Sequence, residues 1–277
     1  EYFEGRTPNP CIRCNTRVRW RALLDKADEL NAHWIASGHY AIIEQEDNGT
    51  SILKKGLDSN KDQSYVLWGL SKDALARTMF PLGRLTKSEV RRLAKDANLI
   101  TAEIAESQEL CFVPNDNYRQ FLHDYAPERT TGESHGEFVD RVGNVVGQHE
   151  GISAYTIGQR RGLGIGGLAD PLYVVKLDAE RKEVVVGPKS MLAPRKIPVR
   201  EINWLGDEPL TSRPEWHIAV RVRSTRPPRD AILRPISATE AEVELLTAEE
   251  GVSPGQACVF YDPESTRIFG GGWIHRG

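Results

Sequence analysis

The sequence predicts three successive parts: an α/β part over residues 1–112, a small mixed α+β part over 113–192, and an all-β barrel over 193–277. In the first part, helical periodicity alternates with short apolar strands, as in proteins built on a parallel sheet. The second part combines one short helix with many glycines and a hairpin. In the third part only strand and turn patterns remain, which is typical of a small barrel or sandwich.

In the first part, a helix is expected to begin at Asn15 or Thr16, because either side chain can cap it. Its apolar positions recur at roughly helical spacing and are Val18, Leu23, Ala27 and Leu30. A short apolar strand is expected over residues 33–36. A second helix begins near Thr86, since Thr86 and Glu89 stand at the spacing of a capping box.

The later elements are predicted from turn chemistry and alternation. A short helix is expected over residues 118–125, and a hairpin over 173–177 and 183–186. The strands of the third part are expected over residues 217–222, 231–233, 242–246 and 257–261. Pro, Gly and acidic residues separate them, as in turns.

Composition excludes several classes of protein. The 277 residues carry 36 Lys and Arg against 39 Asp and Glu, so the net charge of −3 does not indicate a nucleic-acid binder. No apolar run reaches the roughly 18 residues of a membrane helix, and no secretion leader is recognisable. Four cysteines are too few for a disulfide scaffold, which favours a reducing cytoplasm. We therefore expect neither a membrane nor DNA as partner.

The sharpest local feature is the stretch Thr7–Asn15, which contains two prolines followed by Cys11 and Cys14. Cys14 precedes the expected helix start, where the helix dipole lowers a thiol pKa and favours thiolate. This pattern indicates a reactive cysteine. Half of a structural zinc site is the main alternative, but no second closely spaced pair of ligands follows. A thioredoxin-type dithiol is another.

The other two cysteines and the polar motifs are less informative when each is considered alone. Cys111 stands beside Leu110 and Phe112, a setting typical of a buried, unreactive thiol. Cys258 lies within an expected strand and is interpreted as core. Gly38 and His39 follow a strand, where ligands of parallel sheets bind, but a lone histidine is a weak signal.

Two further stretches admit both a functional and an ordinary interpretation. The triplet 61–63, Lys-Asp-Gln, is equally typical of an exposed helix start. The glycine-rich stretch 158–164 does not have the spacing of a phosphate-binding loop and is interpreted as tight turns. Between Arg213 and Arg234 arginines outnumber acidic residues, which suits RNA phosphate contacts or a solvated face.

Taken together, these motifs resemble those of the tRNA-specific 2-thiouridylases (the MnmA/TrmU family), in the same order along the chain. The matching stretches are Gly5–Asn15, Ser37–Tyr40, Lys61–Tyr65, Ser107–Phe112, Tyr155–Arg160 and Pro254–Gln256. For the fold, the resemblance implies that residues 1–112 are the C-terminal portion of a PP-loop domain, which is adenine nucleotide alpha hydrolase-like. It implies a central domain over 113–192 and a tRNA-binding β-barrel over 193–277.

The resemblance also implies an activity, the ATP-dependent formation of 2-thiouridine at the wobble position of tRNA. ATP, with Mg²⁺, would adenylate the oxygen on carbon 2 of uracil. A persulfide on Cys111, loaded by a sulfur-donor protein, would deliver sulfur to that carbon. Cys14 would release the product and leave a Cys14–Cys111 disulfide, a step that suits a thiolate-prone Cys14.

Binding residues follow by the same resemblance. Asn9, Pro10 and Cys11 would face the target base, and Gly38 would touch ATP. The residues that would contact tRNA are His39, Lys61, Asp62, Gln63, Arg221, Val222 and Gln256. An iron–sulfur cluster on Cys11, Cys14 and Cys111 is the alternative use of the cysteines.

One departure from the family pattern is serious. The ATP-pyrophosphatase loop of the family, Ser-Gly-Gly-x-Asp-Ser, does not occur in the sequence. Because the chain also opens with Glu1 and not Met, we expect an N-terminally truncated form that is inactive by itself. The other explanation is that the ATP-binding half is a separate polypeptide. Two alternatives remain open: a tRNA-binding module without its own catalysis, and a thiol oxidoreductase that uses Cys11 and Cys14.

Overall fold

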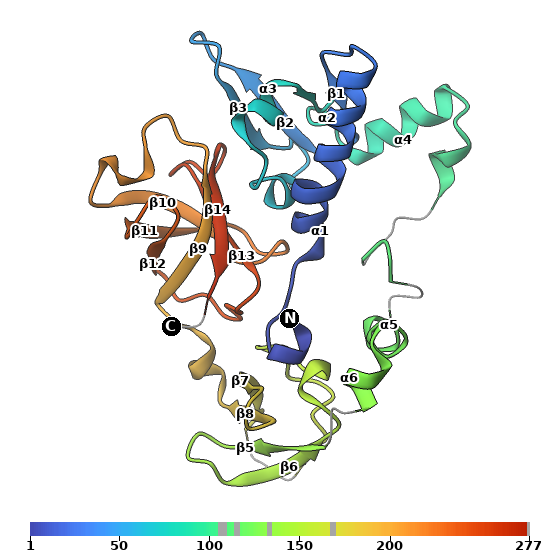
Figure 1. Ribbon diagram of the computed structural model, residues 1–277. Coiled ribbons are helices and arrows are strands. Elements are labelled where there is room, and N and C mark those ends of the chain that lie inside the picture. The colour runs from blue at the N-terminus through green and yellow to red at the C-terminus, as the bar shows by residue number, and fades with distance from the viewer. Residues whose placement is uncertain (105–109, 114–116, 132–134, 167–169, 276–277) are drawn as a thin grey trace.

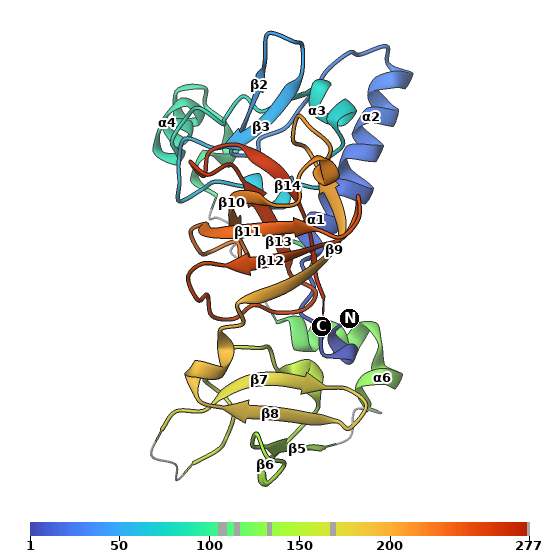
Figure 2. The same cartoon turned by 90° about the vertical axis from the view of Figure 1, so that its left-hand side faces the viewer.

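A computed structural model describes residues 1–104, 110–113, 117–131, 135–166 and 170–275. The α/β part and the barrel lie side by side, and the central part lies below both (Figure 1). The view from the side shows the barrel strands between the hairpin β2–β3 (Ala41–Gln45 and Ser51–Lys55) above and the sheet of the central part below (Figure 2). Both ends of the chain lie near the junction with the central part. None of the helices in the described ranges is long and apolar enough to cross a lipid bilayer.

The chain begins with a short turn, η1 (Tyr2–Glu4), and then a continuous helical run. This run consists of α1 (Pro10–Arg13), a π-helical segment η2 (Cys14–Arg19) and α2 (Trp20–Glu29). It starts at Pro10 because Asn9 caps it: the Asn9 side chain accepts the Ile12 N–H at 3.4 Å.

The expected helix start at Asn15 or Thr16 is therefore wrong. The Thr16 hydroxyl donates to the Ile12 carbonyl at 2.9 Å, which is a contact made inside a helix. Asn15 is buried, and its side chain donates to the Val66 carbonyl at 3.1 Å. The upstream Asn-Pro pair provides a cap at Asn9, six residues before Asn15.

In the rest of the α/β part, the structure confirms the expected parallel pairing of strands and the expected cap of the second helix. Strand β1 (Ile35–Ala36) pairs in parallel with β4 (Thr78–Met79). The Thr86 side chain and Glu89 form the expected capping box at the start of α4. The remaining elements are β2 (Ala41–Gln45), β3 (Ser51–Lys55), η3 (Ser64–Val66), α3 (Lys72–Ala76), α4 (Lys87–Asp96) and η4 (Ile100–Glu103).

The central part contains two helices and a four-stranded sheet in the order β6-β5-β8-β7. Its elements are α5 (Tyr118–Tyr125), α6 (Pro127–Thr131), β5 (Gly136–Val139), β6 (Val145–His149), η6 (Ile152–Ala154), β7 (Tyr173–Asp178), β8 (Glu183–Gly187) and η7 (Lys189–Leu192). The expected helix and hairpin are thus confirmed. A core of its own, centred on Phe138, Val174 and Val184, supports this part.

The third part is a closed six-stranded barrel in the order β10-β11-β12-β9-β14-β13. Its elements are β9 (Lys196–Trp204), η8 (Leu210–Ser212), β10 (Trp216–Arg221), β11 (Arg229–Pro235), β12 (Ala241–Leu245), β13 (Ala257–Tyr261) and β14 (Ile268–Ile274). The expected barrel is confirmed. Strands β9 and β14 were not expected, because Pro198 and the glycines 270–272 weaken their local strand signals.

The barrel and the α/β part share one hydrophobic core. Trp68 meets Trp273 of the barrel edge-on, with ring centroids 5.7 Å apart. Asn203 of β9 donates to the carbonyls of Trp68 and Leu70 at 2.7 and 2.9 Å. These two parts therefore form one packed unit.

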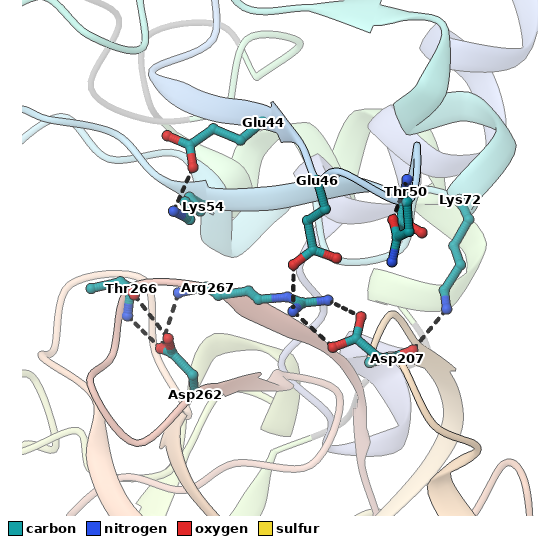
Figure 3. Close-up of polar contacts among 11 residues, drawn as sticks. Glu44, Glu46, Thr50, Lys54, Lys72, Asp207, Asp262, Thr266 and Arg267 are labelled. Atoms are coloured by element: carbon teal, nitrogen blue, oxygen red, sulfur yellow. Dashed lines mark hydrogen bonds and ion pairs between the residues drawn. The ribbon is translucent and has the colours of Figure 1, made fainter.

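A polar seam joins the same two parts where the β2–β3 turn approaches the barrel (Figure 3). Arg267 of the barrel lies between Glu46 and Asp207, at 3.3 and 2.9 Å. Lys72 of α3 donates to the Gly206 carbonyl at 2.7 Å. Core and seam together fix the barrel against the helical run that carries the first two cysteines.

Candidate functional site

Cys11 and Cys14 lie near the beginning of the helical run. Cys111 is close enough to affect the pKa of Cys11. Burial raises the pKa of Cys11, and electrostatic repulsion from the neighbouring Cys111 and Cys14 raises it further, while Arg19 opposes both effects. The tertiary structure thus brings together cysteines that are about 100 positions apart in the sequence. All four cysteines of the chain are free thiols.

Cys14 does not lie at the helix start, where the helix dipole was expected to favour its thiolate. Because α1 begins at Pro10, the thiol in the first helical turn is Cys11, and Cys14 follows that turn as the first residue of the π segment. The dipole at the helix start therefore acts on Cys11. A π segment of this kind is rare and is frequent at functional sites.

Cys111 is exposed and lies in a short turn over residues 110–113. The interpretation as a buried, unreactive thiol is therefore wrong. Phe112 packs edge-on against Phe121 of α5, with centroids 5.5 Å apart, and so the turn rests on the central part. Ser107, Gln108 and Glu109 of this motif lie outside the described residues. Cys258 is fully buried in β13, as expected.

His39 and Gly38 stand at the carboxyl end of β1. The His39 ring is buried, and burial, followed by the charge of Arg19, lowers its pKa to about 4. Since the Arg19 guanidinium can only donate, it donates to Nε2 at 3.4 Å, and Nδ1–H donates to the Ser37 hydroxyl at 2.8 Å. Gly38 is exposed, so its backbone is open to a ligand at the strand end.

The triplet 61–63 is not an exposed helix start, because Asp62 points into the protein. Its carboxylate accepts from Gly56 N, Ser64 N and the Ser64 hydroxyl at 3.0–3.1 Å. Arg221 of the barrel donates to the same carboxylate at 2.9 Å, and the two side chains are 1% and 10% exposed. Two residues of the expected tRNA surface thus pair with each other between the two parts.

The remaining residues of that surface differ in accessibility. Gln63 is exposed, and its side-chain oxygen accepts the Tyr40 N–H at 3.0 Å, which links it to the His39 motif. Lys61 is half-buried, and Val222 is buried in the barrel core. Gln256 donates to the Thr7 carbonyl at 2.9 Å, next to Asn9 and Pro10.

The glycine-rich motif of the central part meets the barrel through Arg223, which sequence analysis did not single out. Arg223 donates to the Gly251 carbonyl at 2.8 Å and to the Ile157 carbonyl at 3.0 Å. Gln159 closes the turn by accepting from Thr156 N and donating to the Arg161 carbonyl. The only sequence signal for Arg223 was its membership of the arginine-rich stretch.

That stretch does not form an unpaired basic face. Arg226 and Arg229 pair with the buried Glu249, at 3.9 and 2.9 Å. The other partners are Glu208 for Arg213, Asp62 for Arg221, and Glu215 and Glu244 for Arg234. Most of its charge is therefore engaged within the protein.

The described residues do not fit a metal centre. Within the described ranges, no group of three His, Cys, Asp or Glu side chains is placed to hold a metal ion. Cys14 and Cys111 are close enough to Cys11 to raise its pKa, but the three described thiols do not form a ligand set.

Three family models match the chain in order. They are described as the tRNA methyl transferase HUP domain, over residues 1–115, the tRNA methyl transferase PRC-barrel domain, over 119–188, and the aminomethyltransferase beta-barrel domain, over 194–274. Together with the closed barrel, they confirm the expected fold class. The boundaries expected at 112/113 and 192/193 stay a prediction.

Curated relatives match the whole chain. The protein named tRNA-specific 2-thiouridylase MnmA from Ruegeria pomeroyi is 57% identical over all 277 residues, which cover 73% of that relative. The proteins of the same name from Dinoroseobacter shibae and Roseobacter denitrificans are 58% and 56% identical, with 71% and 72% of their lengths covered.

Proposed function

Because this chain belongs to the tRNA-specific 2-thiouridylase family, we propose that its cysteines transfer sulfur to carbon 2 of the wobble uridine in tRNA. Membership of the family already implies a sulfur-transferring enzyme that acts on tRNA. The observation that carries the proposed roles of the cysteines is the proximity of Cys14 and Cys111 to Cys11. Cys11 stands close enough to both Cys14 and Cys111 for their charges to raise its pKa.

The proposed transfer needs two thiols. Cys111 carries the sulfur as a persulfide, and the terminal sulfur attacks carbon 2 of the activated uracil while AMP leaves with the oxygen. The Cys14 thiolate then attacks the Cys111 sulfur. The sulfur–sulfur bond breaks, its electron pair stays on the product sulfur, and a Cys14–Cys111 disulfide remains. A thiol reductant must supply two electrons before the next turnover.

The exposures of the two cysteines suit these roles. Cys111 is exposed, as a sulfur that is loaded by a donor protein must be. Cys14 is half-buried and directly follows α1, whose preceding segment is held on the barrel through Thr7. Asn9, Pro10 and Cys11 form the first turn of the same helix, and we propose that the target base lies against them.

ATP supplies the leaving group when it is bound, by adenylating the uracil oxygen. We propose that the exposed backbone of Gly38, at the carboxyl end of β1, contributes to holding it. The sequence contains no Ser-Gly-Gly-x-Asp-Ser stretch. We therefore expect this chain alone to bind tRNA without adenylating it, and we place the reaction in the cytoplasm with its tRNA substrate.

The residues of the proposed tRNA surface differ in how exposed their side chains are. Gln63 and Lys61 can reach RNA with their side chains. His39, Asp62, Arg221 and Val222 are buried, so we propose that they shape the surface and that any contact runs through the backbone. Arg223, which joins the barrel to the central part, belongs to the same surface.

A mercury gel, which retards thiolated tRNA, tests the proposal. The chain is incubated with tRNA, ATP and a persulfide donor, both alone and preceded by the ATP-loop segment of a relative. We expect a retarded band only with the loop segment and ATP, and none with Cys14→Ser or Cys111→Ser. Cys258→Ala is the matched control and keeps the band, because Cys258 is buried in the barrel.

A band that persists in either serine variant contradicts the roles of the two thiols. No band with the loop segment present, combined with salt-sensitive tRNA binding, supports a tRNA-binding module instead. Reduction of a protein disulfide such as insulin, without ATP or tRNA, supports the oxidoreductase alternative.

A further inference from the structure

The segment just before the cysteine-bearing helix is bound to a loop of the barrel. The Thr7 N–H donates to the Pro254 carbonyl at 2.9 Å. In return, the Gln256 side-chain amide donates to the Thr7 carbonyl at 2.9 Å and lies 3.5 Å from the Pro8 carbonyl oxygen. Both backbone polar groups of Thr7 are therefore held by residues of the other end of the chain.

Gly255 allows this close approach. Its φ is 89°, and a Cβ built there would lie 3.0 Å from the Thr7 carbonyl oxygen and 3.1 Å from Arg6 Cβ. A larger residue would push the two segments apart and would also be strained. The loop is itself fixed to β14, because Gly255 N–H donates to the Ile274 carbonyl and Ile274 N–H to that of Gln256, at 3.0 and 2.8 Å.

The connection from this contact to the cysteines is short and stiff. Two residues separate Pro8 from Cys11. Pro8 and Pro10 each have a restricted φ, and Asn9 is held by its cap contact to Ile12 N–H. A displacement at Thr7 is therefore passed on to Cys11 in the first turn of α1 and to Cys14, which directly follows it.

We propose that Gln256 is a positioning residue for the sulfur transfer: its amide holds Thr7 and Pro8, and so fixes the turn that presents Cys11 and Cys14. This inference rests on the proposed function, because it gives Gln256 a part in that reaction. The resemblance assigns Gln256 to tRNA contact. In the structure, its N–H donor is already engaged with backbone carbonyls before any RNA is present.

The test measures thiol accessibility in this chain without tRNA or ATP. Gln256→Met keeps the size of the side chain, removes the donor and adds no charge. We expect iodoacetamide to alkylate Cys11 and Cys14 about fivefold faster in this variant at every pH at which the rate is measured. The reason is that loss of one hydrogen bond favours local opening by about that factor. Peptide mass spectrometry resolves the rate at each cysteine.

Three controls keep the result interpretable. Cys258, buried in the barrel, reports general loosening and should keep its slow rate. Gln148→Met makes the same change at an exposed position of β6 and should alter no rate. Gly255→Ala disturbs the same contact through the backbone and should accelerate Cys11 and Cys14 as Gln256→Met does.

Unchanged alkylation of Cys11 and Cys14 in both barrel-loop variants overturns the inference. Equal acceleration of Cys258 overturns it too, because the effect is then general loosening. Weaker tRNA binding with unchanged alkylation would show that Gln256 only contacts RNA. Thiolation that fails in the unaltered chain even when the ATP-loop segment and ATP are supplied overturns the proposed function, whatever the alkylation rates are.

Discussion

Asp62 and Arg221, two residues of the proposed tRNA surface, form an ion pair inside the protein. Both charges are almost completely removed from water, with side chains 1% and 10% exposed. Asp62 also accepts three hydrogen bonds around its own turn, and Arg221 reaches the Ser224 carbonyl. The Nε of Arg221 finds no partner among the described residues. The guanidinium therefore depends on Asp62 for its neutralisation.

We expect Asp62→Asn to lower the free energy of unfolding by about 3–5 kcal/mol, because it leaves a buried guanidinium without its counter-charge. Arg221→Met should cost a similar amount, and the double variant should cost clearly less than the sum. Urea denaturation of the four proteins measures the coupling. Additive costs would contradict a direct partnership of the two charges.

The helical run from Pro10 to Glu29 is the element that carries the first cysteine motif. Its middle turn is π-helical, with Trp20 N–H bonded to the Asn15 carbonyl five residues earlier. Next to this turn, Thr16 packs against Gly69: a Cβ built on Gly69 would lie 2.3 Å from Thr16 Cγ2. The segment that follows η3 can approach the helix only because position 69 has no side chain.

Gly69→Ala should therefore destabilise the protein by about 1–3 kcal/mol through overpacking against Thr16. In a Thr16→Ser background the methyl group is gone and the hydroxyl bond to Ile12 remains possible. The same Gly69→Ala change should then cost less than about 1 kcal/mol. A double-mutant cycle in urea tests this, and equal costs in both backgrounds would refute the contact as the cause.

The described residues form three hydrophobic cores. One core runs from the α/β part into the barrel and contains Trp20, Trp68 and Trp273. A second core fills the barrel itself and contains Leu233 and Phe260. The central part has its own core around Phe138. It touches the rest through local contacts, such as Arg223 with Ile157 and the stacked rings of Tyr2 and Tyr118 at 5.4 Å.

This division predicts which parts unfold together. Trp68→Ala should weaken the α/β part and the barrel alike, and Phe138→Ala only the central part, each by about 3–5 kcal/mol. Hydrogen exchange is measured in peptides from β3, β13 and β8, which report on the α/β part, the barrel and the central part respectively. Faster exchange in β3 without a matching change in β13 would show that the shared core is not one cooperative unit.

Much of this organisation could be predicted from the sequence, because its signals are local. The capping box at Thr86 and Glu89 and the helix over 118–125 depend on residues within one or two turns of each other. The hairpin of β7 and β8 likewise follows from alternation and turn residues. The helix cap expected at Asn15 or Thr16 was wrong, because Asn9 also has a capping side chain and Asn15 is buried inside the helical run.

Sequence patterns suffice for the fold class, the order of the motifs and the types of residue available for chemistry. Folding of the whole chain is needed to show that Cys111 is exposed near Cys11, that Asp62 faces Arg221, and that Gln256 holds Thr7. The last two pairs are separated by 159 and 249 positions. Local patterns carry no information on such pairs, because closure of the barrel and burial of the shared core determine which distant segments meet.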